Sequence, residues 1–129
     1  MTSVTPPDGQ RSDHEQAVSR LHAERDALRA RAAQLTDEMA GLIAASRDSN
    51  ADDEHDPEGQ TIAYERSQLA AMIRRARAHL DEVDAAFARV AAGRYGLCEV
   101  CQGPVGQERL EVRPTARTCI EHASLRSRS

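Results

Sequence analysis

The sequence has very few bulky aromatic side chains from which to build a core. Its 129 residues include one Phe, two Tyr and no Trp, and alanine is by far the most frequent of the 40% that are hydrophobic. A chain of this size with so little side-chain volume usually needs a metal, a disulfide or a long helical seam. We therefore expect one small domain, or one module with tails, that is stabilised in one of these ways.

Lysine, long apolar runs and an apolar N-terminal segment are also lacking. All 17 basic residues are arginines, and the net charge of −4 argues against a general nucleic-acid binder, whose affinity rests on neutralised phosphates. No apolar run approaches the roughly 18 residues of a membrane span, and "MTSVTPPDGQRSD" has no signal-peptide core. These features predict a soluble, cytoplasmic protein without membrane association.

Three cysteines are too few for a disulfide framework, because they cannot all pair. Two of them form a C-x-x-C motif. Without an export signal, this pattern favours metal or redox chemistry over structural disulfides.

A heptad repeat follows a short irregular leader. Residues 1–12 carry Pro, Ser, Thr and Gly without periodicity, which predicts a disordered segment. From Asp13 onward apolar residues recur in two columns, with Ser12 or Asp13 as a candidate N-cap and Arg25 as the one polar exception. The columns are Leu21, Leu28, Leu35 and Leu42, and three residues before them Val18, Ala32 and Met39.

A second heptad repeat follows the acidic stretch "SRDSNADDEHDPEGQ" at 46–60. Thr61 is a candidate cap for its start, and Gly93 is a natural helix stop. The second set of columns is Ile62, Leu69, Ala76, Val83 and Val90, with Ile73, Leu80 and Phe87.

Two helical seams of similar length predict a mostly α protein, in which residues 13–93 form an antiparallel two-helix coiled-coil hairpin with an acidic tip loop at 46–60. Leu42 should then meet Ile62, and Leu21 should meet Val83 and Phe87. About 30 residues per helix give a rod of roughly 45 to 50 Å. The alternative is a parallel homodimer on each seam. Residues 94–122 would form a small C-terminal zinc finger and 123–129 a basic tail.

The C-terminal part offers four soft donors: Cys98, Cys101, Cys119 and His122. Their C-x2-C-x17-C-x2-H spacing suits tetrahedral zinc, because each pair places two donors on one knuckle. Gly103 and Pro104 supply a tight turn, and "VGQERLEVRP" should form a short hairpin or strand-like excursion between the pairs. A complete shell leaves no position for water, so we expect one structural Zn²⁺ and no enzyme activity.

The finger has little else to stabilise it. Its expected core is Tyr95, Leu97, Val105, Leu110 and Val112, whereas zinc binding in small fingers contributes roughly 10 to 16 kcal/mol. We expect the finger to unfold without the ion. Two alternatives stay open: a metal-free redox pair of Cys98 and Cys101, and a site with three ligands in which His122 is an ordinary surface residue.

The finger resembles the DksA/TraR zinc-finger proteins of bacteria, whose pattern is Tyr-Gly-x-Cys-x-x-Cys, then Arg-Leu, then Pro-x-Ala before the second ligand pair. The matching residues here are Tyr95, Gly96, Cys98, Cys101, Arg109, Leu110, Pro114, Ala116 and Cys119. The resemblance implies a regulator that binds RNA polymerase directly, without DNA contact. Its coiled coil would enter the secondary channel, the zinc end would stay at the rim, and the alarmone ppGpp is a further candidate ligand.

If the protein is such a regulator, the residues of the tip that contact the partner are expected to be Asp52, Asp53, Glu54, Asp56 and Glu58. The tip differs from the family's Asp-Pro-x-Asp-x-Ala pattern, because Gly59 and Thr61 stand at the second Asp and the Ala. His122 stands where the family has a fourth cysteine. A solvated loop is the simpler explanation of the acids, although six acids and no base between Asp48 and Gln60 would repel one another.

Two other functions remain open at this point. A coiled-coil interaction adaptor would use the exposed helix faces rather than the tip. A thiol or zinc sensor would release its metal when Cys98 and Cys101 are oxidised. A DNA-reading finger is disfavoured, because residues 94–122 hold four arginines against four glutamates.

Overall fold

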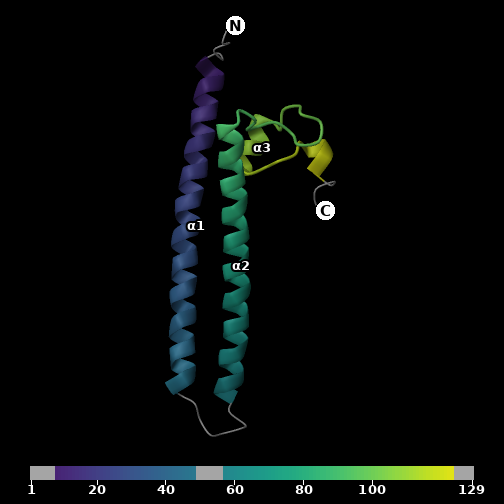
Figure 1. Ribbon diagram of the computed structural model, residues 1–129. Coiled ribbons are helices and arrows are strands. Elements are labelled where there is room, and N and C mark those ends of the chain that lie inside the picture. The colour runs from purple at the N-terminus through teal and green to yellow at the C-terminus, as the bar shows by residue number, and fades with distance from the viewer. Residues whose placement is uncertain (1–7, 49–56, 124–129) are drawn as a thin grey trace. The chain divides into compact units, whose positions relative to one another are not determined.

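The computed structural model describes residues 8–48 and 57–123 of the chain, and these are almost entirely helical (Figure 1). Two long helices, α1 (Asp8–Asp48) and α2 (Pro57–Ala91), are followed by the short helix α3 (Gln107–Val112) and a 3₁₀ turn, η1 (Ile120–His122). The described residues contain no sheet, only an isolated antiparallel bridge between Leu97 and Pro104. None of the described helices is long and apolar enough to span a membrane.

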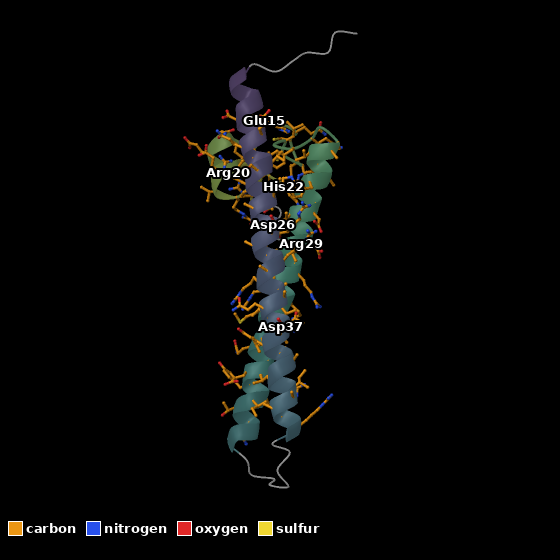
Figure 2. The ribbon with its side chains drawn as sticks, turned by 90° about the vertical axis from the view of Figure 1, so that its left-hand side faces the viewer. Glu15, Arg20, His22, Asp26, Arg29 and Asp37 are labelled. Carbon is orange, nitrogen blue, oxygen red and sulfur yellow. The ribbon has the colours of Figure 1, made fainter. Side chains whose placement is uncertain are left out.

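The chain divides into two compact units. One consists of residues 26–81, and the other combines residues 1–25 with residues 82–129. Within each unit α1 and α2 run side by side in opposite directions, as the two views agree (Figures 1 and 2). The predicted fold class, a mostly α chain with an antiparallel two-helix hairpin and a small C-terminal finger, is confirmed.

The seam between the helices uses the expected heptad columns. Leu35 and Ala76 are buried in the unit of residues 26–81, and Leu21 and Val83 are buried in the other unit. The latter pair agrees with the expected meeting of Leu21 and Val83, whereas the pairing of Leu42 with Ile62 stays a prediction. Apolar burial on this scale stabilises by about 1.5–3 kcal/mol for each Leu or Val side chain.

Arg25, the polar exception in the first seam, packs against an aromatic ring. Its guanidinium carbon lies 4.4 Å from the ring centre of Phe87, and its Nη2 donates to Nδ1 of His22 at 3.0 Å. The His22 ring lies 4.6 Å from the same Phe87 ring. A cation over an aromatic face is attracted by the ring's quadrupole, so an arginine is tolerated at this seam position.

The helices are longer than the sequence predicted. Residues 8–12, expected in the leader, belong to α1, so the candidate caps Ser12 and Asp13 lie inside a helix. The candidate cap Thr61 likewise lies inside α2, which begins at Pro57. A proline suits the first helical position, because its missing N–H would have no partner there. The tip loop predicted at 46–60 is therefore shorter at both ends.

Gly93 ends α2 as predicted. Its φ is +70°, its N–H bonds to the carbonyl of Val90 at 3.1 Å, and the N–H of Arg94 bonds to that of Arg89 at 2.8 Å. This pair of bonds is the Schellman arrangement, which needs a left-handed residue at that position. The turn redirects the chain from α2 into the finger.

Gly93→Ala should destabilise the protein by about 1–2 kcal/mol, because a Cβ is disfavoured at positive φ even though no atom lies within 4 Å to obstruct it. Gly41→Ala is the matched control, since its Cβ also meets nothing but lies inside α1. That change should stabilise by about 1 kcal/mol. Urea unfolding followed by far-ultraviolet circular dichroism measures both, and shifts of the same sign would contradict this account.

Candidate metal centre

The first ligand pair sits on a tight backbone turn. The N–H of Cys98 bonds to the carbonyl of Gly103 at 2.8 Å, and the N–H of Gln102 bonds back to the carbonyl of Cys98 at 2.9 Å. Gln102 has a φ of +61° and Gly96 a φ of +84°. The chain therefore folds back on itself around Cys98 and Cys101, as expected of a zinc knuckle.

The second pair is placed by the 3₁₀ turn η1. Cys119 directly precedes the turn, and the N–H of His122 bonds to the carbonyl of Cys119 at 3.0 Å. Three residues of a 3₁₀ helix make one full turn, so the side chains of Cys119 and His122 come to the same side.

The four donor atoms converge on one point. One ligand atom from each of Cys98, Cys101, Cys119 and His122 lies within 4.8 Å of all the others. The Sγ atoms of Cys101 and Cys119 are 3.9 Å apart. Nδ1 of His122 is 3.7 Å from Sγ of Cys98 and 3.1 Å from Sγ of Cys119.

These separations fit tetrahedral zinc. Bond lengths of about 2.3 Å to sulfur and about 2.0–2.1 Å to nitrogen give donor–donor edges of about 3.8 Å and about 3.6 Å. The donor–donor distances of the cluster scatter around these edges, and Nδ1 is the imidazole nitrogen that faces the thiols. The predicted site residues are therefore brought together, and the three-ligand alternative loses support.

Backbone groups prepare Cys98 for metal binding. The N–H of Val100 points at its Sγ at 3.4 Å. Burial raises the pKa of the Cys98 thiol, but hydrogen bonds from the backbone of Cys101, Cys119 and Val100 outweigh burial and lower the pKa to about 6. Since zinc binds the thiolate, this environment favours the form that the metal needs.

Hydrogen bonds that do not involve the ligands hold the two pairs in place. Nε of Arg109, on α3, donates to the carbonyl of Thr118 at 2.9 Å, directly before Cys119. The N–H of Glu99, directly after Cys98, bonds to the carbonyl of Arg117 at 2.9 Å. These bonds position each ligand pair through the protein's own contacts.

The finger core lacks two of the predicted residues and contains Ala116, which was not predicted. Val105, Leu110 and Ala116 form a buried cluster against which Tyr95 packs. Leu97 is 41% exposed and Val112 is 83% exposed, so neither belongs to this core. The stretch between the ligand pairs is also not strand-like but contains α3, which turns Leu110 inward and Val112 outward.

Tyr95 links this core to the chain before the second ligand pair. Its hydroxyl donates to the carbonyl of Pro114 at 2.8 Å, and burial raises its pKa, so it stays a neutral donor. Nη2 of Arg89, on α2, reaches the carbonyl of Thr115 at 3.3 Å. The sequence did not predict the roles of Arg89, Thr115 and Thr118, because a bond from an arginine to a distant loop carbonyl has no periodic signal.

The tip residues cannot be placed in the same way. Asp52, Asp53, Glu54 and Asp56 lie outside the described residues, and Glu58 lies in the first turn of α2. Their role stays a prediction.

Comparison with known proteins agrees with the geometry. Residues 93–121 match the prokaryotic dksA/traR C4-type zinc finger. The fold is similar to a structure of transcription factor DksA2 from Pseudomonas aeruginosa, with 27% identity, a TM-score of 0.52, and coverage of 85% of this chain and 84% of that one. The finger is therefore of the DksA/TraR type, and the expected resemblance to the DksA/TraR family is confirmed. Its pattern residues now have physical roles, since Arg109 bonds to Thr118, Leu110 and Ala116 form the core, and Pro114 accepts from Tyr95.

Two relatives share shorter segments with this chain. The RNA polymerase-binding transcription factor DksA of Caulobacter vibrioides is 45% identical over 47 residues, which are 36% of this chain and 33% of that protein. The uncharacterized protein YteA of Bacillus subtilis is 36% identical over 72 residues, 56% of this chain and 30% of that protein. The aligned segments are thus about a third of each relative's length.

The DksA/TraR finger and the four-donor cluster are together compatible with one structural zinc ion. The matched finger is of the C4 type and ends at residue 121, so His122 follows as a donor of a different kind. A zinc ion there would tie η1 to the knuckle of Cys98 and Cys101.

Metal analysis of the purified chain should find about one zinc per molecule, and Cys119→Ser should lose most of it. His122→Cys should keep zinc, because it restores a four-thiolate set. In the cobalt-substituted protein, His122→Cys should shift the d–d absorption, since the ligand set changes from three sulfurs and one nitrogen to four sulfurs. An unchanged spectrum would show that His122 is not a ligand.

Proposed function

We propose that this protein is a transcriptional regulator that binds RNA polymerase directly. The observation that carries the proposal is the DksA/TraR-type finger attached to a helical hairpin similar to that of DksA2. A relative that shares 47 residues is named for binding RNA polymerase. A non-enzymatic, cytoplasmic role fits this assignment.

In the proposed mechanism the hairpin is inserted through the secondary channel of the polymerase and carries the acidic tip. The finger is the structural anchor at its base, with Cys98, Cys101, Cys119 and His122 as the zinc ligands. Hard carboxylate oxygens at the tip suit contact with a magnesium-dependent centre or with basic side chains near it. The acids assigned to this task are Asp52, Asp53, Glu54, Asp56 and Glu58.

An anion pocket supports ppGpp as a second ligand. Arg109, Arg113 and Arg117 are separated in sequence but line one pocket of about 150 Å³ with Thr115, Thr118 and Glu82. Nε of Arg117 is buried without a hydrogen-bond partner among the described residues, whereas its Nη1 lies 3.7 Å from Oε1 of Glu99. Guanidinium groups pair well with phosphate oxygens, so we propose that a phosphate group of ppGpp occupies this pocket.

Purified zinc-loaded protein should bind core RNA polymerase in a pull-down. Neutralising the five tip acids to Asn or Gln should leave binding largely intact but abolish the effect on transcription in vitro, because the tip acts after docking. Asp37→Asn with Glu38→Gln, exposed acids on α1, is the matched control. Failure of the native protein to bind polymerase would reject the proposed function.

The same assays separate the alternatives. An interaction adaptor would lose function through its helix faces and not through the tip. A thiol sensor would release zinc under mild peroxide and lose polymerase binding at the same rate.

Arg113→Ala should reduce the response of polymerase-bound protein to ppGpp by at least about tenfold in half-maximal concentration, since a charge-assisted bond is worth about 1.5–3 kcal/mol. Titration of ppGpp into the transcription assay measures this. Arg94→Ala, an exposed arginine outside the pocket, should not change the response. Equal responses in the native and Arg113→Ala proteins would remove ppGpp from the proposal.

A further inference from the structure

A shallow groove runs along one edge of the hairpin within residues 26–81. It has a volume of about 420 Å³ and is lined by Met39 and Ile43 of α1 and by Ala63, Arg66, Ser67 and Ala70 of α2. Met39 and Ile43 are only half-buried. Four of the six lining side chains are apolar, so the groove suits an apolar side chain from outside.

The same edge continues to a pair of arginines. Ile43, Thr36 and Arg29 are spaced by seven residues on α1, and Ala63, Ala70 and Arg77 are spaced by seven on α2. In a coiled coil, residues seven apart lie on one line along the helix. Ile43 and Ala63 line one groove, and the helices are antiparallel. Arg29, fourteen residues before Ile43, therefore lies at the same level along the hairpin as Arg77, fourteen residues after Ala63.

These arginines lack a complementary charge. Arg29, Arg77 and Arg74, one turn before Arg77, are all exposed. Within residues 8–48 and 57–123, no ion pair or hydrogen bond engages any of the three, and Asp26 and Asp81, about one turn away, are not paired with them. Flanking positions of a coiled coil usually carry opposite charges across the seam. By this register the two like charges of Arg29 and Arg77 flank the seam at one level instead. Figure 2 labels Arg29 on α1.

Between the groove and the arginines the edge offers little competing polarity. The hydroxyl of Thr36 is engaged by the carbonyl of Ala32 at 2.8 Å. A ligand along this edge would meet apolar surface and, about 15 Å further on, positive charge, since ten residues of helix separate Met39 from Arg29.

We propose that this edge docks an amphipathic, acidic helix of RNA polymerase, an inference that rests on the proposed function. The partner helix places apolar side chains in the groove and carboxylates, about three turns away, against Arg29, Arg74 and Arg77. In helix-in-groove docking of this kind, apolar side chains on one face of the bound helix pack into the groove. The arginines then set the orientation and the rate of association.

Other occupants fit less well. A nucleic acid needs a continuous line of positive charge for its phosphates, whereas half of this edge is apolar and the chain carries a net charge of −4. A second copy docked edge to edge would offer these arginines either the same arginines or its groove, whose lining contains no carboxylate.

The arginines are tested by charge reversal. Arg29→Glu with Arg77→Glu should weaken binding to core RNA polymerase by at least about tenfold and flatten its dependence on salt. Arg31→Glu with Arg75→Glu is the matched control, because these exposed arginines lie at the same level but off this edge. Equal circular dichroism spectra establish that the variants are folded.

The groove is tested separately. Ala63→Tyr should weaken binding by a similar factor, because the ring fills the groove, whereas Ala78→Tyr, at an exposed alanine on α2 outside the groove, should not. A photo-crosslinking residue at Thr36 should capture a polymerase peptide from an acidic helix.

The possible failures are distinguishable. If the native protein does not bind polymerase, the proposed function fails and this inference fails with it. If the native protein binds and the Arg29/Arg77 reversal binds equally well, only this inference is overturned. Crosslinking at Thr36 to a second copy of the chain, or to nucleic acid, overturns it as well.

Discussion

The convergence of Cys98, Cys101, Cys119 and His122 on one point is the constraint on which the finger depends. The buried cluster of the finger consists of three side chains, those of Val105, Leu110 and Ala116, which is too little apolar area to order thirty residues against their conformational entropy. A metal that joins two knuckles supplies what the core does not. The hydrogen bonds from backbone N–H groups to Cys98 favour its thiolate, so folding and metal binding support each other.

A turn and several hydrogen bonds connect the ligand cluster of the finger to the end of α2. Gly93 turns the chain out of α2, and Arg89, one turn earlier, holds the carbonyl of Thr115. Arg109 holds the carbonyl next to Cys119. Each bond satisfies a backbone carbonyl in a loop that has no sheet partner, where an unpaired buried group would cost about 1–3 kcal/mol. The family pattern of the finger is thus a pattern of carbonyl partners and small core residues as much as of metal ligands.

The sequence predicted those features that repeat or that have a fixed spacing. Heptads identified the seam of Leu21, Leu35 and Val83, and ligand spacing identified the metal cluster. Burial of Ala17 and Ala86 was not predicted, because alanine is common on both faces of these helices. The stretch around Leu110 and Val112 alternates like a strand, but it forms α3, which follows Gly106 with its φ of +110°. The six residues of α3 are too few for periodicity to decide between helix and strand.

The exchange of a cysteine for His122 changes the charge of the centre more than its geometry. The backbone N–H of Gly103 lowers the pKa of Cys101, but desolvation by burial and interactions with Cys98 and Cys119 outweigh it and leave the pKa above its ordinary value. Three thiols this close already resist joint ionisation, and a fourth would add to that repulsion. A neutral imidazole completes the tetrahedron with one negative charge fewer. The centre therefore keeps its structural role and at the same time presents a weaker negative field to the arginines that precede Cys119.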